Sequence, residues 1–422
     1  MGREAKPRDR VEIVYGGKKY VGVLMQRPER ADPNHITLKL SSGYDIGLDR
    51  SKITSLKVLE SIESKSHETS SKKPVVGISG SKPLVSVLAT GGTIASRVDY
   101  LTGGVHSAFS AQELISAVPE LSAYANVSGK QVFNKFSENI SPTDWVTLAS
   151  EVYSELKRGV SGVVITHGTD TMGYSAAALS FMLKTPVPVV FTGAQRSSDR
   201  GSSDAAVNLT HSVRVAAEGD LSGVFVVMHG GSSDTTSLIH NGVNVRKLHS
   251  SARGAFQSVN VIPSGSVDES GVKLADGVVG RRGEIDLDAK IDEHVALLKY
   301  YPGLGPKYVD FLVSSGVKGI VVEGSGLGHV CDGLFKSLGD AGSSGVSVAM
   351  TSQTIHGRVN MDVYSTGRRL LELGVIPCGG MISETAYVKL MWVLGHTKQS
   401  GKVRDMMVED MRGEMANKSP IV

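Results

Sequence analysis

A hydroxyl side chain that could do chemistry stands just past the end of an apolar segment. Residues 84–93 read LVSVLATGGT, a β-branched run that predicts a buried strand and breaks at Gly91 and Gly92. Thr93 follows at the strand end, which is where open α/β sheets bind ligands. A threonine that only caps the next element is the competing interpretation, and this segment alone favours it.

A second segment repeats this arrangement. Residues 162–172, GVVITHGTDTM, predict another β-branched strand, with Thr169 and Asp170 in the turn before a helix. A helix cap is again the alternative, but two hydroxyl-bearing turns at strand ends of one sheet favour a site. His167 is predicted to be structural, because a lone histidine at a strand end is more often packed than catalytic.

Amide hydrolysis by a threonine needs a base, oxyanion donors, and groups that hold the charged end of the substrate. The main-chain N–H groups of the turn at Gly91 and Gly92 are candidate oxyanion donors, and a lysine that has lost its proton is the remaining candidate base. No GxSxG motif occurs, and Cys331 beside His329 is expected to be a small buried hydrophobic residue. The sequence therefore favours a threonine-based site.

Longer matches around both segments resemble the bacterial-type L-asparaginase and glutaminase family. They are ATGGTIAS and ITHGTDTM, followed by FTGAQR, GVFVVMHGG and TSQTIHGRVN, so the resemblance covers roughly residues 84 to 400. It implies that Thr93 is the nucleophile and that Thr169 and Asp170 work with Lys247. A lysine starts near a pKa of ~10.4, so burial would have to favour loss of its proton, and a nearby aspartate would oppose that loss.

The same resemblance implies residues that hold the substrate. Ser137 and Glu138, in NKFSENISP, match the position where the family binds the α-carboxylate and the α-ammonium group. A turn before a helix cap at Ser141 explains these two residues equally well. Residues 96–110 are polar with a Gly-Gly pair and predict a mobile lid, in which Tyr100 is the nearest match to the tyrosine that closes on the family's nucleophile.

Composition limits the class of protein. The chain has 422 residues, 40% hydrophobic and 21% charged, which predicts two or three soluble domains. A net charge of +3 does not by itself indicate nucleic-acid binding. Two cysteines without a CxxC motif predict neither disulfides nor a metal site and fit a reducing cytoplasm. No signal peptide and no membrane span are expected, because no run of eighteen apolar residues occurs.

The order of patterns along the chain predicts four segments. Short β-rich runs in 1–60 predict a small β-barrel used for docking, and the Ser, Lys and Gly-rich stretch 61–83 predicts a linker. Residues 84–290 alternate four apolar strands with helices, and a shorter βα series fills 291–422. The fold class is therefore α/β, with a doubly wound parallel sheet in a two-domain body preceded by a small N-terminal β-barrel domain, and the family resemblance implies that this body is an asparaginase-like two-domain fold.

The added N-terminal module distinguishes this layout from that of free asparaginases. It resembles the D-subunit family of the archaeal glutamyl-tRNA(Gln) amidotransferases, which implies a glutaminase that supplies ammonia to an E subunit (GatE). That partner would use ATP and Mg to convert Glu-tRNA(Gln) to Gln-tRNA(Gln), and would carry most contacts to tRNA(Gln). No cofactor is expected in this chain, which lacks a GxxxxGK[ST] motif.

The resemblance also implies that two copies of the chain form a homodimer within a heterotetramer. Two alternatives remain open. The chain could be a stand-alone L-asparaginase with an extra domain, or a non-catalytic scaffold that binds RNA or protein. The sequence leaves open whether glutamine or asparagine is preferred, how Thr169 and Lys247 share proton transfer, and whether the N-terminal module touches RNA.

Overall fold

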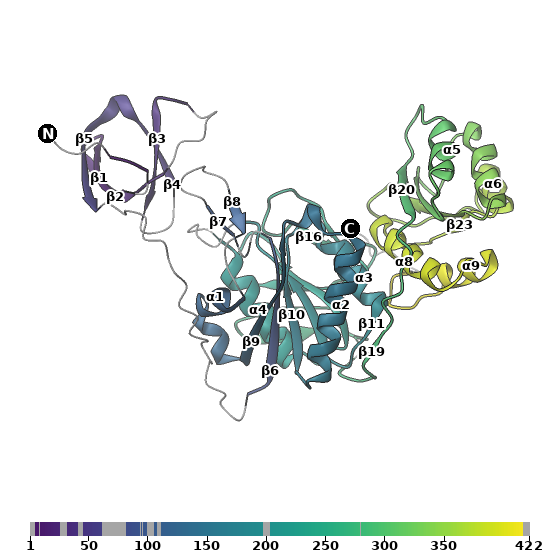
Figure 1. Ribbon diagram of the computed structural model, residues 1–422, viewed down its shortest axis with the longest axis horizontal. Coiled ribbons are helices and arrows are strands. Elements are labelled where there is room, and N and C mark those ends of the chain that lie inside the picture. The colour runs from purple at the N-terminus through teal and green to yellow at the C-terminus, as the bar shows by residue number, and fades with distance from the viewer. Residues whose placement is uncertain are drawn as a thin grey trace.

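The computed structural model describes residues 5–7, 9–25, 32–40, 45–60, 82–92, 94, 96–98, 105–107, 111–196, 203–278 and 280–416. These residues form an N-terminal sheet, a central α/β unit that contains the largest sheet, and a C-terminal α/β unit (Figure 1). The N-terminal sheet lies at one end of the molecule and the C-terminal unit at the other (Figure 1).

The N-terminal sheet has five antiparallel strands in the order β4-β3-β2-β1-β5. Its strands are β1 (Arg10–Tyr15), β2 (Lys18–Leu24), β3 (His35–Leu40), β4 (Asp45–Asp49) and β5 (Ile53–Glu60). Gly16 and Gly17 both have positive φ, 55° and 77°, and so form the two-residue turn that a right-twisted hairpin requires. Inward side chains, among them Val11, Ile13 and Leu38, make a separate core. The expected small antiparallel domain is confirmed.

The sheet of the central unit has eight strands in the order β18-β17-β14-β13-β12-β10-β6-β9. Five neighbouring strands are parallel: β9 (Asn126–Lys135), β6 (Leu84–Gly91), β10 (Gly162–Thr166), β12 (Pro188–Thr192) and β13 (Gly223–His229). Antiparallel strands continue it: β14 (Ser237–Asn241), β17 (Gly265–Asp268) and β18 (Gly271–Leu274). Short ladders pair β7 (Ser96–Val98) with β8 (Val105–Ser107), β11 (Leu183–Lys184) with β19 (Asp286–Leu287), and β15 (Val245–Lys247) with β16 (Phe256–Ser258).

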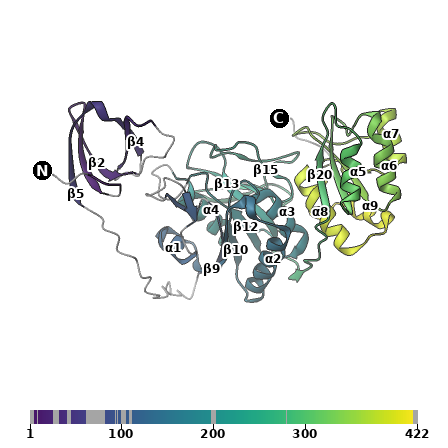
Figure 2. The ribbon, with the colours of Figure 1, turned by 45° about the horizontal axis from the view of Figure 1, so that its top comes forward.

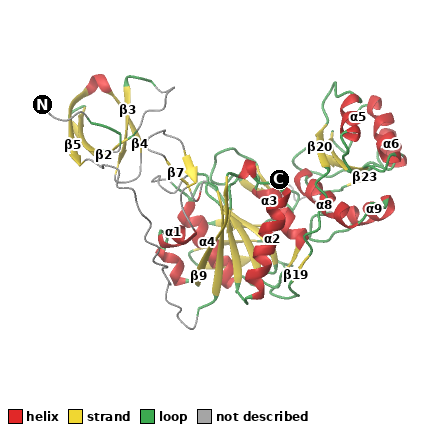
Figure 3. Cartoon of the chain, viewed as in Figure 1, coloured by secondary structure: helices red, strands yellow, loops and turns green. Residues whose placement is uncertain are grey.

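Helices cover both faces of this sheet, as Figure 3 shows in red against yellow strands. One face packs against α2 (Pro142–Lys157) and α3 (Met172–Met182), and the other against α1 (Ala111–Ser116) and α4 (Ala205–Glu218). Burial on both faces explains why β6, β10, β12 and β13 are continuous apolar runs. The doubly wound parallel arrangement expected for these four strands is confirmed.

The structure contains a strand that the sequence patterns do not predict. Strand β9 has the mostly polar sequence NVSGKQVFNK and lies at the edge of the sheet, where its side chains are half-buried. An edge strand needs no continuous apolar run, so its pattern is weak. The turn-rich residues 254–283, which resemble hairpins and alternate like a strand from Phe256 to Val267, contain β16 and the hairpin of β17 and β18.

The C-terminal unit has a parallel sheet in the order β20-β21-β22-β23. Its strands are β20 (Val295–Lys299), β21 (Gly319–Gly324), β22 (Ser347–Ser352) and β23 (Ile376–Pro377). Its helices are α5 (Lys307–Ser314), α6 (Phe335–Ser343), α7 (Ser365–Glu372), α8 (Ser383–His396) and α9 (Ser400–Val408). Within the described ranges no helix is both long and apolar enough to cross a membrane.

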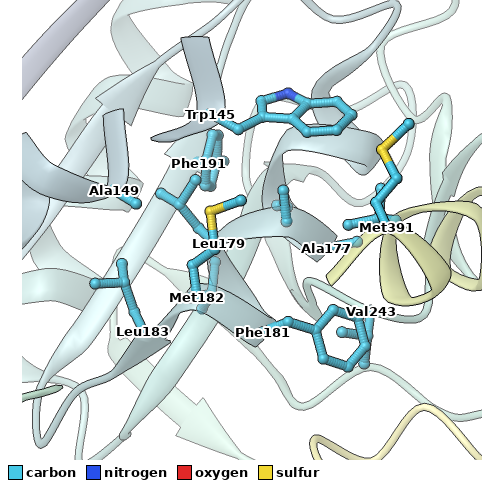
Figure 4. Packing of buried hydrophobic residues seen from close by; sticks show 14 of the residues in the cluster. Trp145, Ala149, Ala177, Leu179, Phe181, Met182, Leu183, Phe191, Val243 and Met391 are labelled. Carbon is cyan, nitrogen blue, oxygen red and sulfur yellow. The ribbon is translucent and has the colours of Figure 1, made fainter. Parts of the chain in front are cut away.

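Helix α8 joins the C-terminal unit to the central unit through one continuous apolar core. The same buried cluster contains side chains of α2, α3 and the central strands together with side chains of α8, β21 and β22. Figure 4 shows Met391 of α8 entering the group formed by Trp145 of α2 and by Ala177 and Phe181 of α3. The position of α8 is therefore fixed by packing against the helix that begins just after Asp170.

A fully buried ion pair fixes the segment around Glu414 to α8. Lys389 Nζ donates to Glu414 Oε1 at 2.5 Å and to the carbonyl oxygen of Met407 at 3.2 Å, and neither charged side chain is exposed. The carboxylate of Glu414 also accepts main-chain N–H groups of Met411 and Arg412. A charge this deeply buried depends on its partners.

We expect Lys389→Met to lower the free energy of unfolding by about 3 kcal/mol, because it leaves the Glu414 carboxylate buried without its cation. The double variant Lys389→Met, Glu414→Gln should recover at least half of that loss, since its neutral amide needs no cation and its single oxygen can still accept one of the two main-chain N–H groups. Urea denaturation followed by circular dichroism measures both values. A single-variant loss near zero, or no recovery in the double variant, would contradict this account.

Candidate active site

The two predicted turns lie side by side because β6 and β10 are neighbouring parallel strands. Gly91 and Gly92 end β6 with positive φ, 106° and 78°, a conformation that favours glycine. A Cβ atom at Gly92 would collide with the main-chain nitrogen of Gly168, so the two turns are in direct contact. Thr93, which follows Gly92, lies outside the described residues, and so does Tyr100.

Lys247 reaches the second turn from a distant part of the chain. Its Nζ donates to Thr169 Oγ1 at 2.8 Å and pairs with Asp170 Oδ1 at 2.7 Å. The lysine side chain is 11% exposed and that of Asp170 is 68% exposed, so the ammonium group sits at the boundary between the core and solvent. Thr169, Asp170 and Lys247 therefore form one cluster, with Gly91 and Gly92 beside it.

Ser137 lies against the same cluster, and Glu138 is exposed to solvent beside it. Both belong to the 3-10 turn Ser137–Asn139 between β9 and α2, in which Ser137 is buried and Glu138 is exposed. A Cβ atom at Gly168 would lie 2.9 Å from Ser137 Oγ, and Thr171 Oγ1 donates to the Ser137 carbonyl oxygen at 2.7 Å. This segment is thus a turn before a helix and also a wall of the candidate site.

His167 is buried in a chain of hydrogen bonds beneath the turn. Its Nδ1–H donates to the Gly168 carbonyl oxygen at 2.6 Å, and its Nε2 accepts the hydroxyl of Ser175 at 2.9 Å. The indole N–H of Trp145 donates to that hydroxyl at 3.0 Å. Burial lowers the pKa of His167 to about 4, so the imidazole is neutral near pH 7. The prediction that His167 is structural is confirmed.

We expect His167 to make folding stability depend on pH. Its folded pKa of about 4 lies below the ordinary value of 6.5, so the unfolded chain binds more protons below pH 6.5. The contribution is fully present above pH 6.5 and is lost as the pH falls toward 4. Between pH 7.5 and pH 5.5 the protonation of His167 lowers the free energy of unfolding by about 1.4 kcal/mol. In His167→Asn the fall in the free energy of unfolding over this pH range should be smaller than in wild type by that amount. Urea denaturation at several pH values measures it, and equal slopes in both proteins would contradict it.

Residues that support the site from α4 are absent from the sequence prediction. Asp204 accepts the main-chain N–H groups of Gln195 and Arg196, and Asn208 Nδ2 donates to the Gly193 carbonyl oxygen at 2.9 Å. Both side chains are fully buried. The turn they hold packs on the site, because a Cβ atom at Gly193 would lie 3.1 Å from Thr169 Cγ2. An Asp and an Asn four residues apart at a helix start are the signal that could have indicated them.

Two further findings concern the C-terminal unit. The expected burial of Cys331 is wrong: the residue is exposed, because it precedes the short 3-10 helix Asp332–Leu334 as its N-cap and leaves the core there. Residues 324–328, GSGLG, start at the last residue of β21 and form a turn, closed by the bridge between Ser325 and His329. Among the residues that the structure describes, no three His, Cys, Asp or Glu side chains gather as metal ligands.

Three family models match the chain along its length. They are "GatD N-terminal domain" over residues 5–59, "Asparaginase, N-terminal" over 84–279 and "Glutaminase/Asparaginase C-terminal domain" over 294–407. Among solved structures, the thermostable L-asparaginase from Thermococcus kodakarensis matches with a TM-score of 0.71 and 33% identity, over 79% of this chain and 99% of that one. The probable cytoplasmic L-asparaginase from Campylobacter jejuni matches with a TM-score of 0.68 and 29% identity, over 78% and 100%. The expected asparaginase-like fold is confirmed.

Curated relatives match over nearly the whole chain. The D subunit of glutamyl-tRNA(Gln) amidotransferase from Methanothermobacter thermautotrophicus is 48% identical over 405 residues, which cover 95% of this chain and 92% of that protein. The protein of the same name from Pyrococcus abyssi is 49% identical over 417 residues, covering 98% and 93%. The chain therefore belongs to the family of glutamyl-tRNA(Gln) amidotransferase D subunits, in which an asparaginase-type body follows an added N-terminal domain.

Proposed function

We propose that this chain is the glutaminase component of a tRNA-dependent amidotransferase. It hydrolyses the side-chain amide of glutamine, or of asparagine, and supplies the ammonia to a partner. The observation that supports this most directly is the contact of Lys247 Nζ with Thr169 Oγ1 and Asp170 Oδ1, at 2.8 and 2.7 Å, beside the turn that precedes Thr93.

In the proposed reaction Thr93 Oγ attacks the amide carbon and its proton passes to the leaving nitrogen, which departs as ammonia. The acyl-enzyme ester is then hydrolysed by water, which regenerates the hydroxyl and releases the carboxylic acid. The turn at Gly91 and Gly92 would supply main-chain N–H donors to the oxyanion. Lys247, bridging Thr169 and Asp170, would move the protons in both steps.

Ser137 and Glu138 are proposed to hold the amino-acid end of the substrate. The Ser137 hydroxyl lies against Gly168, and the exposed Glu138 carboxylate follows it in the same turn. A hydroxyl suits the α-carboxylate and an acid suits the α-ammonium group. Tyr100 would close over the nucleophile once substrate is bound.

The partner chemistry is proposed from the names of the relatives and from the family resemblance. The ammonia would pass to an E subunit (GatE), which would bind ATP and Mg and amidate Glu-tRNA(Gln), and which would carry most contacts to tRNA(Gln). This chain would need no cofactor of its own, and two copies would form a homodimer within a heterotetramer. A cytoplasmic location, where charged tRNA is used, belongs to the same proposal.

A stand-alone L-asparaginase is the second candidate, favoured by the likeness to the two L-asparaginase structures. Ammonia release by the purified chain with glutamine or asparagine separates the candidates. Slow release that rises at least tenfold when the E subunit and Glu-tRNA(Gln) are added supports the amidotransferase component. Fast ammonia release whose rate is unchanged by both additions supports the free hydrolase. No release under any condition would leave only a binding scaffold.

A further inference from the structure

The position of Lys247 depends on a very short strand. Strand β15 has three residues, pairs only with β16 among the described strands, and ends at Lys247. The ladder sets Lys247 opposite Phe256, and the N–H of Leu248 donates to the Ala255 carbonyl oxygen at 2.7 Å. A ladder of this length cannot define a side-chain position alone, so neighbouring elements must hold β15.

Two helices lie against β15 and the residues just before it. On one side is the first turn of α3, where a Cβ atom at Gly173 would lie 3.1 Å from the Val245 carbonyl oxygen. On the other is the first turn of α8, where Thr385 Oγ1 donates to the Val243 carbonyl oxygen at 2.7 Å in a buried hydrogen bond. Figure 2 shows β15 beside α3, on the side of the central unit that faces α8.

One ion pair joins α8 to the strand itself. Glu384, the second residue of α8, places Oε1 3.0 Å from Arg246 Nε. The Glu384 side chain is 13% exposed and that of Arg246 is 30% exposed, so water screens the pair only weakly. Arg246 and Lys247 are consecutive in a strand and therefore point to opposite sides. Arg246 faces the C-terminal unit, and Lys247 faces Thr169.

Arg246 is the cation that pairs with Glu384, and Lys299 adds a weaker attraction. The Glu384 Oε2 atom is buried and has no hydrogen-bond partner among the described residues. Burial raises the pKa of the Glu384 carboxyl, and Arg246 offsets part of that effect. Burial together with the charge of Glu384 also raises the pKa of Tyr174, on the first turn of α3, to about 12. The pair thus lies in a partly buried junction between α3, β15 and α8.

We propose that Glu384 of the C-terminal unit is a positioning residue for the reaction: through Arg246 it holds β15 so that Lys247 Nζ stays between Thr169 and Asp170. The proposal deepens the proposed function and rests on it for its consequence in catalysis. Glu384 pairs with the strand, not with the Thr169 turn, and so acts on the site only through β15. The two sides of β15 then have different roles: Arg246 holds the strand through Glu384, and Lys247 contacts Thr169 and Asp170.

The test compares Glu384→Gln and Arg246→Gln with wild type in the full chain. Each variant is expected to lower kcat for ammonia release about tenfold with KM within twofold, because substrate groups are untouched. The double variant should be no slower than the slower single variant, since both changes remove the same link. Arg412→Gln is the matched control: Arg412 Nε donates to the Ser180 carbonyl oxygen, another contact between the units at the far end of α3.

A second readout does not depend on activity. Acetylation of Lys247 by limiting acetic anhydride, read by mass spectrometry, should be at least threefold faster in both variants than in wild type and unchanged in Arg412→Gln. Arg246→Lys, which keeps the positive charge, should give intermediate values of kcat and of labelling. Unchanged Lys247 labelling, additive effects on kcat, or changes equal to those of Arg412→Gln would overturn the proposal. A wild-type chain without ammonia release would refute the proposed function, while the labelling would still report on Glu384.

Discussion

Thr93→Ala is expected to lower the rate of ammonia release from glutamine by about 10⁴-fold or more while the fold persists. The change removes the only atom that could form the acyl ester in the proposed reaction. The neighbouring Gly91 and Gly92 keep the turn, because their positive φ values and the contact of Gly92 with Gly168 are main-chain features. A coupled ammonia assay and the thermal unfolding midpoint measure the two parts of the expectation.

Thr93→Ser is the control for this result. It retains a hydroxyl on the same turn and should keep the rate within about tenfold of wild type. Hydrolysis of the acyl-enzyme can be followed separately by trapping the ester at low pH and measuring the mass of the chain. Near-normal activity in Thr93→Ala would mean that another group is the nucleophile, and Thr169, hydrogen-bonded to Lys247, would be the next to replace.

Lys247→Met is expected to lower kcat about 10³-fold, within the range that general acid–base groups contribute. Methionine fills the space of the alkyl chain but cannot exchange protons with Thr169 or balance the charge of Asp170. KM should change far less than kcat, because Ser137 and Glu138, not Lys247, are proposed to hold the amino-acid end. Steady-state kinetics with glutamine at saturating and low concentration separate the two constants.

Two controls define the role of this lysine. Lys247→Arg keeps a positive charge that is not lost near neutral pH, and should be nearly as slow as Lys247→Met if proton transfer is the task. Lys273→Met removes an exposed lysine of β18 that pairs with Asp268 of β17, and should leave kcat unchanged. If Lys247→Arg restored most of the rate, Lys247 would act by charge alone.

The strongest patterns in the sequence predict the sheet because their physical cause is local. Strands β6 and β10 are buried on both faces, so their residues are continuously apolar, and the glycines that end β6 are required by its turn. Strand β9 is not predicted, because an edge strand is half-exposed. The N-terminal sheet is predictable because the sequence before β2, β3 and β4 contains glycine or asparagine, although the connection to β5, Arg50–Lys52, contains neither.

The candidate site is only partly readable from local patterns. Thr169 and Asp170 follow from the end of a strand, but Lys247 lies on a three-residue strand with no periodicity and is indicated by resemblance alone. Its neighbour Arg246 pairs with Glu384 from the C-terminal unit, and no spacing rule connects those two positions. Contacts between units depend on how whole helices pack, and that information is spread over the core rather than held in a motif.

The continuous core through α3 and α8 has a consequence for protein engineering. Helix α8 contributes Met391 to the same cluster as Ala177 and Phe181, so the two units share this part of their apolar interior, although each also has a cluster of its own. Grafting the C-terminal unit from a distant homologue would bring mismatched surfaces together at this boundary, even if each part kept its own secondary structure. Chimeras of this family should therefore take α3 and α8 from the same parent protein.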